Sequence, residues 1–103
     1  MTEPKLVRDR IPEMLRRLGL NPVTHLVCGE DYWLSLKTKL QEEVAEFIES
    51  EEVEEIADIL EVIEAICVHR GIDPAHLADV KEKKRRERGA FVEGIVLESA
   101  KPA

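Results

Sequence analysis

The chain has 103 residues, of which 44% are apolar and 36% charged, and its formal net charge is −7 at pH 7. This length and composition fit one small globular domain spanning 1–103. The negative balance argues against a nucleic-acid partner. No apolar run reaches membrane-spanning length and no signal sequence precedes the first helix, which favours a soluble cytoplasmic protein without a membrane partner.

The first predicted element is a short helix over residues 11–18. Its apolar positions recur at helical spacing and are Ile11, Met14, Leu15 and Leu18. Asp9 is the predicted N-cap, so Pro12 falls in the first turn, where its missing N–H costs little. Gly19 ends the run.

Residues 23–27 are β-branched and apolar, which predicts either a short strand or an extended connector. Residues 95–97 have the same character. A pairing of the two segments would add a minimal two-strand element to an otherwise helical chain.

A second, long helix is predicted from Glu30 or Asp31 to about Glu49. Its predicted buried stripe comprises Trp33, Leu36, Leu40, Val44, Phe47 and Ile48. Glu43 interrupts this stripe, so its carboxylate must be paired, protonated or bound to a metal. Glu46 lies at the edge of the stripe, and Glu42 points further towards solvent.

The third predicted helix has Ser50 as its N-cap and ends at Arg70 and Gly71. Glu51 and Glu52 then fall in the first turn, where the helix dipole favours acidic side chains. The tight connection predicts an antiparallel hairpin with the second helix. The predicted buried face comprises Ile56, Ile59, Leu60, Ile63, Ile66 and Cys67, with Glu55 and Asp58 at its border.

A fourth helix is predicted to begin with Asp73 as N-cap and Pro74 at the first helical position, and to end at Gly89. It carries the basic run 81–88, whose default interpretation is a solvated helical end. Cys28 and Cys67 show no CxxC spacing and are interpreted as reduced thiols, with at least one in the core.

The acidic stretch 42–64 contains eleven carboxylates and no Lys or Arg. Glu43 with Glu46, and Glu55 with Asp58, are each spaced three apart, so the members of each pair share a helix face. Across a hairpin these four carboxylates form a metal site made only of oxygen ligands. Such a site suits Mg²⁺ or Mn²⁺ better than Zn²⁺ and leaves room for substrate phosphates.

The spacing alone leaves an alternative open, because ExxE and ExxD arise easily in a chain rich in charge. The alternative is an acidic amphipathic hairpin that mediates association without catalysis.

Two acidic segments, Glu42–Phe47 and Glu55–Glu61, resemble the EExxE…ExxD signature of the MazG-like all-α nucleoside triphosphate pyrophosphohydrolases. The opening Lys5–Pro12 is similar to the KLVRDKIP start of a compact, phosphoribosyl-ATP pyrophosphohydrolase-like subgroup. The closing Arg88–Phe91, followed by Gly94, is similar to that subgroup's RGGF ending. The resemblance runs from about residue 5 to residue 98.

The resemblance implies an all-α, four-helix fold, a homodimer or homotetramer, and Mg²⁺-dependent cleavage between the α and β phosphates. The products are a nucleoside monophosphate and pyrophosphate. By position, the implied metal ligands are Glu43, Glu46, Glu55 and Asp58, and Glu46 or Glu42 would activate water. The implied phosphate-binding residues are Arg8, Arg10, Lys81, Lys84 and Arg85.

The hairpin departs from many members of that superfamily, because only eight residues separate Glu46 from Glu55. Little room is left for a base-recognition loop, and no motif specific to phosphoribosyl-ATP is present. The candidates for stacking on a base are Tyr32 and Trp33, although Trp33 lies on the buried stripe.

Overall fold

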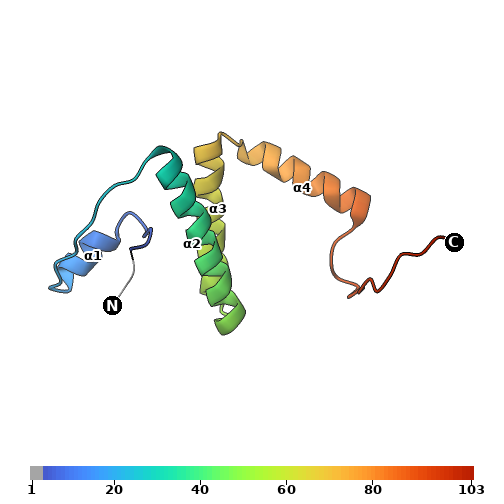
Figure 1. Ribbon diagram of the computed structural model, residues 1–103, viewed down its shortest axis with the longest axis horizontal. Coiled ribbons are helices and arrows are strands. Elements are labelled where there is room, and N and C mark those ends of the chain that lie inside the picture. Colours follow the sequence, from blue (N-terminus) through green and yellow to red (C-terminus); the bar gives the residue numbers. More distant parts are fainter. Residues whose placement is uncertain (1–3) are drawn as a thin grey trace. The chain divides into compact units, whose positions relative to one another are not determined.

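The computed structural model describes residues 4–103, which form four α-helices and no strand (Figure 1). The helices are α1 (Ile11–Arg17), α2 (Gly29–Ser50), α3 (Val53–Arg70) and α4 (Pro74–Arg88). The predicted all-α class is confirmed. The chain divides into two compact units, of which the first ends at Gly71 and the second comprises Ile72–Ala103.

The predicted two-strand element is wrong for the described residues, because neither 23–27 nor 95–97 forms a strand. Residues 19–28 instead form the connector between α1 and α2. Val23 is 96% exposed and Leu26 is 99% exposed. Their β-branched and apolar character therefore reflects neither ladder pairing nor burial within this chain.

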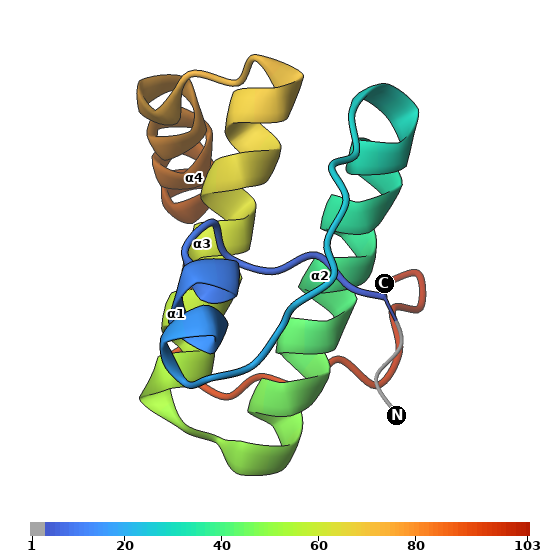
Figure 2. The same cartoon turned by 90° about the vertical axis from the view of Figure 1, so that its left-hand side faces the viewer.

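The first unit is organised around the hairpin of α2 and α3, which lie antiparallel (Figure 2). Its buried apolar residues are Leu36 on α2 and Val62 and Cys67 on α3. The helices are joined by Glu51 and Glu52 alone. Glu51 adopts a left-handed conformation with φ 58°, and its N–H donates to the Phe47 carbonyl at 2.7 Å. This local reversal closes α2 and turns the chain back.

The predicted N-cap at Ser50 is wrong, because Ser50 is the last residue of α2 and α3 begins at Val53. The Ser50 hydroxyl accepts from the Glu52 N–H at 3.2 Å and so supports the turn itself. The first-turn acids of α3 are Glu54 and Glu55, in place of Glu51 and Glu52.

The apolar stripes of the hairpin are wider than the face that the hairpin buries. Val44, Ile48, Ile56 and Leu60 were predicted to be buried, but all four are exposed, with Ile48 at 70% and Leu60 at 60%. Two facing helices bury one narrow seam, so the outer part of each stripe is not covered by the partner helix.

Pro4–Arg10 lies across the hairpin, and α1 follows it (Figure 2). The predicted N-cap at Asp9 is wrong: Arg10 occupies that position and makes no side-chain cap. The Ile11 N–H donates to the Arg8 carbonyl at 3.1 Å, so a backbone turn leads into the helix. Pro12 stands in the first turn, as predicted.

The second unit consists of α4 and an extended tail. Asp73 caps α4 as predicted, accepting from the Ala75 N–H at 2.8 Å, and Gly89 follows the last helical residue. No side chain of α4 is buried. Among the described helices, none is long and apolar enough to cross a membrane.

Candidate metal centre

Carboxylates from α2 and α3 converge across the hairpin in two overlapping groups. Glu43, Glu55 and Asp58 each offer an oxygen that lies within 4.8 Å of the others. Glu42, Glu43 and Glu46 form a second group with the same spacing. The structure thus places the four carboxylates singled out from the sequence in these groups, and Glu43 belongs to both.

Glu43 is the one buried charged residue among those described, with 5% of its surface exposed. Its Oε2 is shielded from solvent and has no hydrogen-bond partner, and the same holds for Oε2 of Glu55. An unpaired buried carboxylate oxygen is costly, since its desolvation is not compensated. Oxygens of this kind are the ligands that Mg²⁺ and Ca²⁺ take in proteins, so the donor set fits a hard divalent cation.

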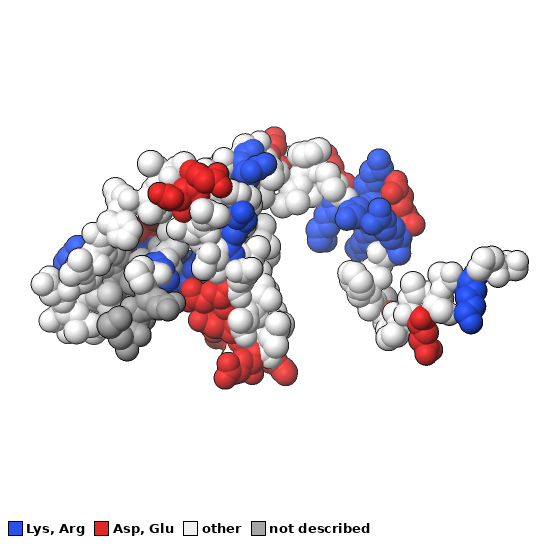
Figure 3. Space-filling view, viewed as in Figure 1, with Lys and Arg blue, Asp and Glu red and all other residues white. Residues whose placement is uncertain are grey.

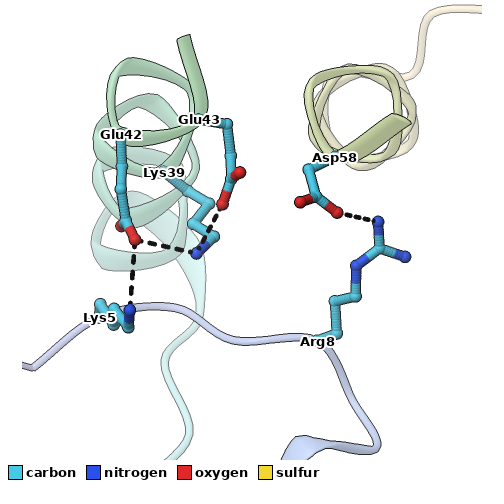
Figure 4. Close-up of polar contacts among 6 residues, drawn as sticks. All are labelled: Lys5, Arg8, Lys39, Glu42, Glu43 and Asp58. Carbon is cyan, nitrogen blue, oxygen red and sulfur yellow. Dashed lines mark hydrogen bonds and ion pairs between the residues drawn. The ribbon is translucent and has the colours of Figure 1, made fainter. Parts of the chain in front are cut away.

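Three cationic side chains face these carboxylates (Figure 4). Lys39 Nζ lies 3.3 Å from Glu42 Oε1 and 3.0 Å from Glu43 Oε1. Lys5 Nζ lies 3.4 Å from Glu42 Oε1. Arg8 reaches α3, with Nη2 at 2.7 Å from Asp58 Oδ1. The segment before α1 therefore brings positive charge to both helices of the hairpin.

Lys39 and Glu61 were missed from the sequence. Lys39 precedes Glu42 by three residues and Glu43 by four, a spacing that places all three on one helix face and that does signal the contact. Desolvation lowers the pKa of the Lys39 ammonium, but Glu43 and Glu42 outweigh this effect and the net shift is upward. Glu61 is exposed and lies 3.7 Å from Arg8 Nη1.

The pKa of Glu55 is raised from its ordinary 4.5 to about 7. Desolvation is the largest cause, followed by the adjacent Glu46 carboxyl and then by the charges of Glu43 and Asp58. Like charges that share a site disfavour ionisation of the last member. Near neutral pH, Glu55 therefore holds its proton more tightly than an isolated glutamate does.

A pH-dependent stability follows for the metal-free chain. The folded pKa of Glu55 lies above its unfolded value. Its contribution to the free energy of unfolding is therefore fully present below about pH 4.5 and is lost as the pH rises through about 7. We expect the melting temperature in EDTA to fall between pH 5 and pH 8. In Glu55→Gln this part of the slope should disappear. A variant with the wild-type slope would show that Glu55 does not titrate in this range.

A cavity of about 850 Å³ adjoins the carboxylates and lies wholly within the first unit. Its polar lining includes side chains of both charges and one tyrosine. These residues are Lys5, Arg8, Asp9, Arg10, Tyr32, Lys39, Glu43, Asp58 and Glu61. The two arginines predicted to bind phosphate thus line the same cavity as two of the predicted metal ligands. The volume lies within the usual range for small-molecule sites.

The two stacking candidates occupy different environments. Tyr32 lines the cavity, whereas Trp33 is not part of its lining. The Trp33 ring stacks on His69, with ring centroids 5.7 Å apart and an interplanar angle of 20°. Lys37 and Arg70 lie over the same ring, at 5.3 and 4.9 Å from its centroid. The Tyr32 ring meets the same His69 edge-on, with ring centroids 5.1 Å apart. Both aromatic side chains therefore link α2 to the end of α3, and Tyr32 is the one that also lines the cavity.

The three remaining predicted phosphate ligands are Lys81, Lys84 and Arg85, which lie on α4 in the second unit. All three are exposed there. Figure 3 shows basic side chains gathered on α4 and acidic ones where α2 passes into α3. Their role towards phosphate stays a prediction.

Comparison with known proteins gives one partial likeness. A protein of Mycolicibacterium smegmatis, described as uncharacterised, is 52% identical over 42 residues. The match covers 41% of this chain and 43% of that protein, so the chain spans less than half the length of this relative. No family model matches the chain, and no solved structure does.

Proposed function

We propose that the chain is a Mg²⁺-dependent nucleoside triphosphate pyrophosphohydrolase of the MazG-like type. It cleaves between the α and β phosphates and releases a nucleoside monophosphate and pyrophosphate. Clearance of non-standard nucleotides is a role that suits this activity. The observation that carries the proposal is the buried Glu43, whose Oε2 is unpaired and whose carboxylate converges with those of Glu55 and Asp58 beside a cavity of about 850 Å³.

The proposed ligands of Mg²⁺ are Glu43, Glu55 and Asp58, with Glu46 next to Glu55. Mn²⁺ is an acceptable substitute for such a set of oxygens. The bound ion would act as a Lewis acid towards the phosphate oxygens. It would also relieve the repulsion among the carboxylates, so ligand deprotonation and ion binding would be coupled.

Glu46 is better suited than Glu42 to accept a proton from the attacking water. Glu42 Oε1 already lies within 3.4 Å of two ammonium groups, those of Lys5 and Lys39. Glu46 is exposed and, within residues 4–103, forms no ion pair. A carboxylate that is not paired with a fixed cation and has access to water fits the requirements of a general base.

Arg8 and Arg10 are the proposed contacts to the outer phosphates, because both line the cavity. The planar guanidinium presents paired donors that match phosphate oxygens. Lys81, Lys84 and Arg85 are further proposed contacts, carried by the basic run of α4. Tyr32 is the proposed stacking surface for the base.

We propose a homodimer or homotetramer as the working form. The outer faces of α2 and α3 expose Val44, Ile48, Ile56 and Leu60. Burial of an apolar face, rather than intrinsic helix propensity, supplies most of the stability of helices in proteins. Sedimentation velocity should give a mass of at least twice 11.7 kDa; a monomer at micromolar concentration would contradict this.

The exposed apolar faces also favour a second candidate, a helical module that assembles with itself or a partner and has no activity. The two functions differ in their response to metal. The enzyme should gain thermal stability from millimolar Mg²⁺, and Glu55→Gln combined with Asp58→Asn should abolish that gain. A purely structural hairpin should show no specific gain. In EDTA, both functions allow the double variant to be as stable as wild type or more stable, because clustered charge is removed.

The direct test is release of pyrophosphate from a panel of standard and modified nucleoside triphosphates. We expect Mg²⁺-dependent formation of equal amounts of monophosphate and pyrophosphate, and none in EDTA. Production of inorganic phosphate and a diphosphate would indicate cleavage at another bond. No product from any member of the panel would contradict the proposed function.

A further inference from the structure

We infer that Lys39 is a positioning residue of the metal centre, whose ammonium fills the Glu42–Glu43 group, so that each chain takes a single divalent ion at Glu43, Glu55 and Asp58. The inference rests on the proposed function, because it concerns the same centre. It distinguishes between two carboxylate groups, in each of which the oxygens lie within 4.8 Å of one another.

The Lys39 side chain is mostly buried, at 15% exposure, and its amine lies between two carboxylates of its own helix. Figure 4 shows the amine directed at both Glu42 and Glu43. The distances of 3.3 and 3.0 Å from Nζ are those of close ion pairs. A lysine ammonium has three donors and no acceptor, so it can satisfy several oxygens at once.

The two oxygens of Glu43 consequently have different surroundings. Oε1 faces Lys39, whereas Oε2 is buried without a partner. The ammonium thereby fixes the orientation of the carboxylate and leaves Oε2 to an ion that Glu55 and Asp58 also reach. The buried, unpartnered oxygen is what distinguishes this group from an ordinary acidic surface.

A second divalent ion at Glu42, Glu43 and Glu46 would lie beside the Lys39 ammonium, which already pairs with Oε1 of both Glu42 and Glu43. Two cations within a few ångströms of each other repel strongly in a partly desolvated site. Glu42 is further neutralised by Lys5 at 3.4 Å. Lys39 therefore supplies, as a fixed side chain, the positive charge that a second metal ion would otherwise bring.

The test is the number of ions bound by the full chain without nucleotide, measured with Mn²⁺ by electron paramagnetic resonance and with Mg²⁺ by calorimetry. Wild type should bind one ion per chain. Lys39→Met, which keeps the length and loses the charge, should bind two. Lys37→Met is the matched control, since Lys37 lies on the same helix over Trp33, and it should bind one ion with the wild-type affinity.

Two ions bound by wild type would overturn the inference and leave the proposed function intact, whereas no ion bound would overturn both. One ion bound by Lys39→Met with unchanged affinity would also overturn the inference. If Lys39→Met does not fold, the ion affinity of Glu42→Gln tests the inference instead. This variant should keep the dissociation constant within about twofold of wild type, while Glu55→Gln should weaken binding by more than about tenfold. If Glu42→Gln weakens ion binding as much as Glu55→Gln does, Glu42 is a ligand and the inference is refuted.

Discussion

Glu43→Gln should lower the rate of pyrophosphate release at least about 100-fold, because the variant loses the charged ligand shared by both carboxylate groups. The amide keeps the shape and volume of the buried side chain, so the fold should persist. The measurement is the initial rate at saturating Mg²⁺ and nucleotide, with circular dichroism to check helicity.

Glu49→Gln is the matched control for this prediction, because it makes the same change on the same helix at an exposed position outside both groups. It should keep the wild-type rate. If Glu43→Gln retains more than about a tenth of the wild-type rate, binding of the ion needed for activity does not depend on Glu43, and the proposed centre is wrong.

Leu36→Ala should lower the free energy of unfolding by about 2–5 kcal/mol, the range for large-to-alanine changes in a protein core. Leu36 is the most completely buried side chain, at 1% exposure, in a seam that otherwise buries only Val62 and Cys67 among apolar residues. With so few core residues, the cavity left behind has little around it that can collapse. Urea unfolding followed by circular dichroism measures the loss.

Leu34→Ala serves as the control, because Leu34 is 49% exposed two residues earlier on α2. Its effect should be within about 1 kcal/mol. If Leu34→Ala and Leu36→Ala lower the free energy of unfolding equally, Leu34 is buried against a second copy of the chain. Repeating both measurements at several protein concentrations separates this case, since association makes the unfolding midpoint depend on concentration.

The helices and the central hairpin could be predicted from the sequence because their signals are local. The apolar stripe and the capping pair Asp73–Pro74 lie within a few positions of the structure that they specify. Glu43 stood out for the same reason, since a carboxylate on an apolar stripe is visible along one helix. Its 5% exposure agrees with that expectation.

The contacts of the N-terminal segment could not be predicted in this way. Lys5 and Glu42 are 37 positions apart, and Arg8 and Asp58 are 50 apart. Helical periodicity contains no information about which surface a preceding extended segment will cross. The ion pairs of Lys5 with α2 and of Arg8 with α3 therefore emerge only from the packing of three separate segments.

The turn between α2 and α3 was mistaken because two local rules competed. Ser50 is a favourable N-cap residue, but the chain continues α2 through Ser50 and reverses at Glu51 with φ 58°. A non-glycine residue with positive φ is uncommon, so a glutamate is not a residue at which a left-handed reversal is expected. The error of two residues in the start of α3 nevertheless left Glu55 and Asp58 on the side that faces Glu43.

The two-residue connection also determines where the chain can change in length. Each residue inserted into α2 between Glu46 and Ser50 would rotate the following helix by about 100° relative to Glu43. With only Glu51 and Glu52 to absorb the change, Glu55 and Asp58 would swing away from the centre. The exposed connector of residues 19–28 has no such constraint. Insertions that preserve ion binding should therefore be accepted in that connector and rejected in the hairpin.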